Sequence, residues 1–232
     1  MLASFPWYDL PSVQWANDAL WHASGLPGEL DHHSSAACLW YHDELLVSQA
    51  CGLDLFLSSA PLVPIAAPVF ELDCEPGHYY SYIVGDPEGK VAAVNSSSSR
   101  SGYSVLLSVC TPRDVLLTGS HVESLAAVRS GRAEVAAIDA VTWHILARDT
   151  PELIRGVEIC TRSCSAPAPP YVIRQGTTAD EVWSGLVRAY ASSAATSARQ
   201  ALLLRDIVAV EKRDYLPVWA EYQHLRLDGH HL

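Results

Sequence analysis

Between residues 90 and 148 the chain alternates three times between a short apolar run and a stretch of helical character. The apolar runs are KVAAV, DVLLTG and AEVAAI, and the helical stretches after them cover residues 102–109, 120–130 and 140–148. Strands that alternate with short helices are typical of right-handed βαβ units, whose strands pair in parallel. The sequence therefore predicts an α/β fold in which the turn after each strand lies at the same edge of a sheet.

Hydrophobic periodicity outside this region predicts further elements. We expect strands in LASF, ELLVSQ, LVPIAAPVF, YYSYIVG and GVEIC, a short helix in CGLDLFLSS, and helices over 13–22, 178–192, 194–204 and 212–225. The proline-rich run SAPAPPYVI is typical of a segment that crosses between lobes. We therefore expect one lobe from residues 1–83 with 172–232, and a second lobe from residues 84–171.

Composition excludes several classes of function. With 232 residues and 49% hydrophobic content, the chain can build one large or two small cores. The net charge of −11, without a Lys/Arg-rich block, argues against nucleic-acid binding. No apolar run is long enough to span a membrane. The start, MLASFPWYDLP, lacks the features of a secretory signal, so we expect a cytoplasmic protein as written, or a periplasmic one if a leader was removed.

The cysteines and histidines give no metal or cofactor signature. Six cysteines are too few for a disulfide scaffold in a chain of this length. Cys51 and Cys74 could approach each other at strand ends; buried thiols are favoured, and the sequence leaves their pairing open. The histidines at 32, 33, 42, 230 and 231 lack the i, i+4 spacing of a helical metal site. We expect no metal and no cofactor.

The turn after the first of the three strands reads NSSSSRSGYSV, and six of its nine residues from Ser96 to Ser104 are serine. The amino end of a helix leaves backbone N–H groups unpaired and carries a partial positive charge. Hydroxyls beside those amides, with Gly102 permitting a close approach, favour a neutral cradle for an anion. A serine cap on a solvated turn is the alternative. No phosphate-binding GxxxxGK[ST] motif is present, so nucleotide hydrolysis is not indicated.

The next two turns carry an imidazole and a carboxylate. In TGSHVESLAAV, Ser120 and Glu123 have the spacing of a capping box, and His121 falls in the first helical turn without a role in the cap. In AAIDAVTW, Asp139 directly follows a strand, either as an ordinary helix cap or as a carboxylate that faces a ligand. Three consecutive turns thus place hydroxyls, an imidazole and a carboxylate at one edge of the sheet.

Taken together, NSSSSRSGYSV, TGSHVESLAAVRSGRAEVAAIDAVTW and SAPAPPYVI resemble the phosphate-, phosphite- and phosphonate-binding proteins of ABC transporters. The likeness extends through LASFPWYDLP, ELLVSQACG and GHYYSYIVG, and so covers most of the chain. It implies a two-lobe, type II periplasmic-binding-protein-like α/β fold with a hinged cleft that closes on a small oxyanion. An ABC permease would be the implied partner.

The resemblance also implies roles for individual residues. Hydroxyl and backbone donors to the oxyanion would come from the serine turn, a further hydrogen bond from His121, and an acceptor from Asp139. The other lobe would contribute Tyr8 and Gln49, with Tyr80 as a weaker candidate. The implied ligand-binding set is Tyr8, Gln49, Ser97, Ser98, Ser99, Ser101, Gly102, His121 and Asp139.

Two classes of function remain open from the sequence. The first is a binding protein that releases its ligand unchanged. The second is a cytosolic enzyme on the same scaffold, similar to chorismate dehydratases or thiamine-pyrimidine synthases, with Asp139 or His121 as general acid or base. A serine hydrolase is disfavoured because Ser120 and His121 are adjacent and no GxSxG motif is present.

Overall fold

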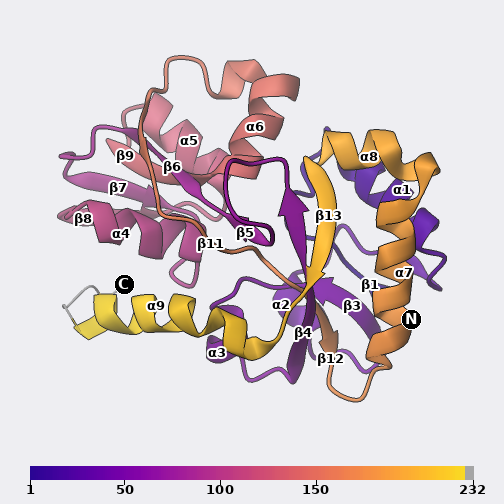
Figure 1. Ribbon diagram of the computed structural model, residues 1–232. Helices are drawn as coiled ribbons and strands as arrows, with labels where there is room; N and C mark the ends of the chain where they lie inside the picture. Colours follow the sequence, from indigo (N-terminus) through magenta and orange to yellow (C-terminus); the bar gives the residue numbers. More distant parts are fainter. Residues whose placement is uncertain (228–232) are drawn as a thin grey trace. The chain divides into compact units, whose positions relative to one another are not determined.

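The computed structural model describes residues 1–227, which divide into two compact units. Unit 1 comprises residues 1–78 and 167–215, and unit 2 comprises residues 79–166 and the C-terminal segment from Leu216. The chain passes from one unit to the other within two short strands, β5 (His78–Tyr79) and β11 (Ala166–Pro167). These two strands pair with each other as a small sheet. The mixed α/β architecture predicted from the sequence is confirmed (Figure 1).

Unit 1 is built on a mixed sheet in the order β13-β4-β12-β3-β1-β2. The N-terminal strand β1 pairs in parallel with β2 and β3, whereas β12 and β13 run antiparallel to their neighbours. The strands are β1 (Leu2–Ala3), β2 (Glu29–Leu30), β3 (Leu45–Gln49), β4 (Leu62–Phe70), β12 (Tyr171–Arg174) and β13 (Leu204–Ala209).

The helices of unit 1 pack against its sheet. Helix α1 packs against α7 and α8, so segments from both ends of the chain form one layer (Figure 1). The helical segments are α1 (Gln14–Ser24), α2 (Ala36–Leu39), α3 (Asp54–Leu57), α7 (Ala179–Ala191), η3 (Ser193–Ala195), α8 (Thr196–Ala201) and η4 (Lys212–Tyr215).

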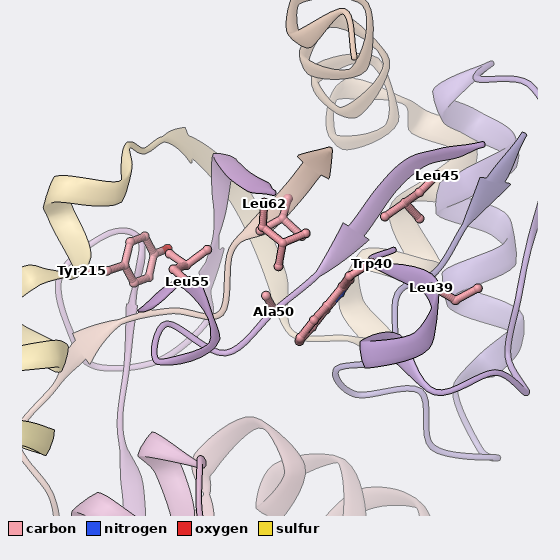
Figure 2. Packing of buried hydrophobic residues seen from close by; sticks show 8 residues of the cluster. Leu39, Trp40, Leu45, Ala50, Leu55, Leu62 and Tyr215 are labelled. Carbon is pink, nitrogen blue, oxygen red and sulfur yellow. The ribbon is translucent and has the colours of Figure 1, made fainter. Parts of the chain in front are cut away.

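Part of the core of unit 1 gathers around Trp40 and Tyr215 (Figure 2). Tyr215 is fully buried, and its hydroxyl donates a 2.8 Å hydrogen bond to the carbonyl oxygen of Ala168, which satisfies its one polar atom. The indole N–H of Trp40 donates to the carbonyl oxygen of Gln49 at 3.2 Å. The cluster thereby anchors the end of β3. Its members are Leu39, Trp40, Leu45, Ala50, Leu55, Leu62, Val172 and Tyr215.

Unit 2 has a five-stranded sheet in the order β10-β6-β9-β7-β8. Strand β7 pairs in parallel with both β8 and β9, which matches the three βα units predicted from the alternating pattern. Strands β6 and β10 add an antiparallel side, which the pattern did not predict. The strands are β6 (Ser81–Gly85), β7 (Val91–Val94), β8 (Asp114–Leu117), β9 (Val135–Asp139) and β10 (Ile159–Arg162).

Because β7, β8 and β9 are parallel, their carboxyl ends lie at one edge, here called the carboxyl edge of unit 2. The residues of β9 are buried throughout, as expected for a parallel strand covered on both faces. The helical segments of unit 2 are η1 (Arg100–Ser104), α4 (Val105–Val109), α5 (His121–Arg129), α6 (Ala140–Asp149), η2 (Pro151–Leu153) and α9 (Leu216–Leu227).

The structure also differs from the sequence prediction in one helix end and in how the chain divides between the units. The helix predicted over 194–204 ends at Ala201, and the chain continues as edge strand β13, whose LRDIVA sequence has only two buried residues and a weak strand pattern. The expected lobe boundaries at 83/84 and 171/172 differ from the observed crossings at 78/79 and 166/167. The C-terminal helix, expected in the lobe of the N-terminus, groups with unit 2.

Candidate ligand-binding site

The serine turn, residues 95–101, joins β7 to a helix that begins as a π-turn, and it includes the first two residues of that helix. Ser99 caps this helix: its Oγ accepts a 3.0 Å hydrogen bond from the backbone N–H of Gly102. The N–H of Ser104 donates to the carbonyl oxygen of Ser99 at 3.1 Å, an i to i+5 bond that widens the first turn. The sequence predicted an ordinary helix over 102–109. Single π-turns inside helices occur frequently at functional sites.

Gly102 permits a close approach that no other residue allows. A Cβ atom at position 102 would overlap the side-chain oxygen of Asn95, which lies against the glycine backbone. This oxygen, Oδ1 of Asn95, is buried and has no hydrogen-bond partner within residues 1–227. Buried acceptors without a partner are rare and usually mark a missing water, ion or ligand. Sequence reasoning had singled out Gly102 but not Asn95, whose only signal was its place directly after β7.

The serines of the turn divide into inner and outer residues. Ser99 and Ser101 are buried, with their hydroxyl oxygens 3.3 Å apart. Ser97 is exposed, and Ser98 is half-buried, with its hydroxyl 3.4 Å from that of Ser96. Within unit 2, Ser99 and Ser101 are therefore part of the packed carboxyl edge, and Ser97 is on the surface.

The second turn meets the first at this edge. Ser120 caps α5 by accepting from the N–H of Glu123 at 3.1 Å, as the capping-box pattern predicted. His121 is the first residue of α5, and its Nε2 atom lies 3.0 Å from the hydroxyl oxygen of Ser101. The structure thus joins two sequence-predicted site residues that are twenty positions apart.

The electrostatic state of His121 follows from its surroundings. The residue is partly exposed as a whole, but its Nδ1 atom is buried. Burial lowers the pKa of His121 to about 4, and the backbone of Ala137 opposes this shift. No atom within residues 1–227 meets hydrogen-bond geometry with Nδ1, although the Ala137 backbone lies close enough to act on the pKa. The imidazole is therefore neutral near pH 7.

Asp139 occupies the third turn as the cap of α6. Its Oδ1 atom accepts from the N–H groups of Val141 and Thr142 at 2.8 and 3.1 Å, and the residue is 3% exposed. The carboxylate stands at a helix amino end, where negative charge is favoured. Tyr80 is close to Asp139, because the carbonyl oxygen of Tyr80 accepts a 3.0 Å hydrogen bond from the N–H of Ala140, the residue after Asp139. Of the two roles that the sequence left open for Asp139, the cap is observed, and the ligand-facing role stays a prediction.

Arg100, within the serine turn, points into the protein and is 4% exposed. Its guanidinium donates to the carbonyl oxygen of Cys164 at 3.2 Å and to the carboxylate of Glu221 in α9 at 3.5 Å, and it lies over the ring of Tyr79. Its Nη1 atom is buried and has no partner within residues 1–227. A lone arginine between a serine run and a helix was the only sequence signal for this position.

The two candidates in unit 1 lie close together. Gln49 ends β3, and its side-chain oxygen accepts a 3.1 Å hydrogen bond from the N–H of Trp7, the residue before Tyr8. Tyr8 is buried with its ring edge-on to Phe70, and its φ of 66° lies in the left-handed region. Such a conformation costs about 1–3 kcal/mol for a residue other than glycine and is concentrated at functional sites.

Cys74 is a thiol whose Sγ–H donates to the carbonyl oxygen of His78.

The carboxyl edge of unit 2 is suited to binding an anion. It combines two helix amino ends with hydroxyls and a neutral imidazole, all of which can donate hydrogen bonds. Residues 1–227 hold no group of three His, Cys, Asp or Glu side chains placed to bind a metal, and His230 and His231 lie outside the described residues. None of the helices within the same range is long and apolar enough to cross a membrane.

Comparisons with known proteins agree with this reading. The family described as "ABC transporter, phosphonate, periplasmic substrate-binding protein" matches residues 82–215, more than half of the chain. This range includes the serine turn, His121 and Asp139. No curated protein sequence matches the chain significantly.

Solved structures share the fold at low sequence identity. A binding protein component of an ABC phosphonate transporter from Pseudomonas aeruginosa aligns with a TM-score of 0.80 at 14% identity, over 99% of this chain and 88% of that one. PhnD1 from Prochlorococcus marinus, solved in complex with methylphosphonate, aligns with a TM-score of 0.75 at 12% identity, over 97% and 98% of the two chains. The type II periplasmic-binding-protein-like fold expected from the sequence is confirmed.

Proposed function

Since the chain belongs to the family of periplasmic substrate-binding proteins of phosphonate ABC transporters, we propose that its serine turn holds a phosphonate or a related small oxyanion. Members of this family bind and deliver a solute and are not enzymes. The alternative of an enzyme with Asp139 or His121 as acid or base receives no support from the family or from the structural relatives.

One observation carries the proposal. The hydroxyls of Ser99 and Ser101 and the imidazole of His121 form a hydrogen-bonded group where the helix that begins with η1 and the helix α5 both present their amino ends. Each hydrogen bond to a charged oxyanion contributes roughly 1.5–3 kcal/mol. Four or five such contacts reach micromolar affinity, about −8 kcal/mol, after the cost of association.

The remaining predicted residues have different roles in the proposed site. Gly102 contributes indirectly, through the hydrogen bond that its N–H donates to Ser99 and through its closeness to Asn95. Ser97 and Ser98 offer further hydroxyls at the outer side of the turn, and Asp139 an acceptor for a protonated ligand oxygen or an amino group. Tyr8 and Gln49 belong to unit 1, and we assign them to the ligand because the strained Tyr8 and the end of β3 are held together through Trp7.

An ABC permease as partner and a location in the periplasm belong to the same proposal. Both follow from the family, whose members collect a solute for a membrane transporter. Reconstitution tests the first: vesicles that contain the cognate permease should take up methylphosphonate only when this protein is added.

Calorimetric titration of the purified chain tests the ligand. We expect methylphosphonate, phosphite or aminoethylphosphonate to bind at micromolar concentration, and sulfate and taurine to bind more weakly. The double variant Ser99→Ala/Ser101→Ala should lose at least tenfold in affinity. Ser108→Ala removes an exposed hydroxyl from α4, which donates to the carbonyl oxygen of Val105, and serves as the matched control. If the double variant bound methylphosphonate as tightly as the control, the serine turn would not be the site.

A further inference from the structure

A chain of hydrogen bonds runs through the carboxyl edge of unit 2. It begins at the N–H of Gly102, passes through the hydroxyls of Ser99 and Ser101, and ends at Nε2 of His121, with successive separations of 3.0, 3.3 and 3.0 Å. A backbone N–H can only donate, so Ser99 accepts at that end. Each hydroxyl carries a single proton, and a neutral imidazole carries a single N–H. Three arrangements of protons therefore satisfy the chain, and they differ in whether Nε2 of His121 carries a proton.

In the first arrangement Ser99 donates to Ser101, and Ser101 donates to Nε2 of His121. Both hydroxyl protons are then used inside the protein, and neither serine can donate to an anion. In the second arrangement Nε2 of His121 carries a proton and donates to Ser101, and Ser101 donates to Ser99. The hydroxyl proton of Ser99 is then available. In a third arrangement Ser99 and Nε2 of His121 both donate to Ser101, and the hydroxyl proton of Ser101 is available. The second and third arrangements, in both of which Nε2 carries a proton, therefore offer the ligand one hydroxyl donor from this chain.

The surroundings of His121 decide how Nε2 comes to carry a proton. Nδ1 is buried, and the backbone of Ala137 acts on the ring in the sense that favours protonation. A backbone group with this effect is a carbonyl, and because Nε2 faces Ser101, this carbonyl acts from the Nδ1 side of the ring. It lies outside hydrogen-bond geometry, but its partial negative charge favours the neutral ring that carries its proton on Nδ1. Nε2 is then an acceptor, which is the first arrangement. Nε2 gains a proton when the ring becomes an imidazolium.

Other charged groups do not account for the state of His121. The elements that contact His121 or pack against α5 carry Asp139 at the end of β9, Glu152 in η2, and Arg100 and Tyr103 in η1. Glu123 and Arg129 lie on α5 itself, and β7 has no titratable side chain. Among the described residues, burial and the Ala137 backbone are the causes of the shift. An anion bound at Ser99 would add the missing favourable charge, because a negative charge nearby stabilises an imidazolium.

We propose that binding of an oxyanion at the serine turn is coupled to the uptake of one proton by His121, which makes Nε2 a donor and frees one hydroxyl, that of Ser99 or of Ser101, to donate to the ligand. The proton comes from solvent and ends on Nε2, so no covalent bond other than this N–H is made or broken. This inference rests on the proposed function and adds its regulation by pH.

The sign of the pH dependence follows from linkage. The complex holds one proton more than the free protein, so the association constant rises as pH falls. The dependence is confined to the range between the pKa of His121 in the free protein and its higher pKa in the complex. Within that range the association constant changes by up to about tenfold per pH unit.

Calorimetry in buffers of different ionisation enthalpy measures the coupling. Methylphosphonate is titrated into the full chain at pH 6.5, and the slope of the observed enthalpy against buffer ionisation enthalpy gives the protons taken up. Methylphosphonate itself titrates near neutral pH, so the comparison is with His121→Gln, whose side chain has a donor and an acceptor but does not titrate. We expect wild type to take up about one proton more per ligand than this variant.

The outcomes separate the two proposals. If wild type and His121→Gln both bind methylphosphonate with equal proton uptake, the coupling is overturned and the proposed function stands. If wild type binds none of the oxyanions, the proposed function fails and the coupling fails with it. A second readout needs only wild type: the ring ¹⁵N signals of one of its ten histidines should change from the neutral to the doubly protonated pattern on addition of methylphosphonate at constant pH. Unchanged patterns for all of them would overturn the coupling.

Discussion

Nδ1 of His32 lies 2.7 Å from Oδ2 of Asp9, the residue that follows the strained Tyr8. The other ring nitrogen of His32 lies 2.9 Å from the carboxylate of Asp18 in α1. Only an imidazolium can donate to both carboxylates at once. Asp9 also accepts a 2.8 Å hydrogen bond from Asn17, so the segment that carries Tyr8 is tied both to α1 and to the loop of His32.

The His32 pair of contacts makes part of the stability of unit 1 depend on pH. Burial lowers the pKa of His32, but the hydrogen bonds to Asp18 and Asp9 outweigh it, and the net shift is upward from 6.5. Because the pKa of His32 is higher in the folded state, its contacts stabilise unit 1 fully below about pH 6.5. This stabilisation is lost as the pH rises through the folded-state pKa of His32. Urea unfolding should show His32→Gln to be less stable by about 1 kcal/mol at pH 6, with a smaller difference at pH 9.

His22→Gln is the control for that experiment, because His22 is an exposed histidine on α1. The change removes a histidine from the same unit without breaking a contact to Asp9 or Asp18. A His32→Gln deficit that is the same at pH 6 and pH 9 would show that the histidine acts through packing alone.

The inner and outer serines of the turn should differ in their effect on stability. Ser99→Ala removes the oxygen that accepts from the Gly102 N–H, and loss of such a cap costs about 0.5–2 kcal/mol. Ser97→Ala removes an exposed hydroxyl and should change the free energy of unfolding by less than about 0.5 kcal/mol. Chemical denaturation of both variants measures the difference. Equal losses would contradict the assignment of Ser99 as the cap.

Gly102→Ala should be destabilising because the new methyl group would overlap Oδ1 of Asn95. Overpacking of this kind costs roughly 1–3 kcal/mol. In the double variant Gly102→Ala/Asn95→Ala the obstructing oxygen is gone, so the two changes should couple by more than about 0.5 kcal/mol in a double-mutant cycle. Additive effects would mean that the glycine is needed for another reason.

A comparison of Asp139→Asn with Asp139→Ala separates the contribution of the helix cap of α6 from that of the carboxylate charge of Asp139. Asparagine keeps an oxygen that can accept from the N–H groups of Val141 and Thr142, whereas alanine does not. Thermal unfolding should therefore show a loss of about 0.5–2 kcal/mol for alanine and a smaller loss for asparagine. Methylphosphonate titration of the asparagine variant then isolates the carboxylate charge, since an unchanged affinity would remove Asp139 from the ligand-binding set.

Local sequence signals predicted the elements that form through neighbouring residues. The apolar runs at 91–94 and 135–139 became β7 and β9, and the spacing of Ser120 and Glu123 became the observed cap of α5. Periodicity and capping act over a few residues, so they can be read directly from the chain. The π-turn at Arg100 was missed because its hydrogen bond from Ser104 to Ser99 has no distinct residue pattern.

Long-range pairings carried no such signal. Strand β13 shows only two buried positions, and it is a strand because β4 offers it an edge. An arginine beside a run of serines carries no local signal for burial, and Arg100 is buried because Glu221, the Cys164 carbonyl and the Tyr79 ring surround it. Such contacts join residues far apart in the sequence, so only the packed chain decides them.

The amino-acid sequence by itself determined the α/β architecture of this protein and the placing of hydroxyls, an imidazole and a carboxylate in three successive βα turns, because alternation and capping are local properties. Only the tertiary structure decided that Ser99 and Ser101 turn inward, that Ser101 meets His121, and that the imidazole is held neutral. Those properties depend on which groups burial brings together and on how much water it removes around them, and neither is encoded in any short stretch of the chain.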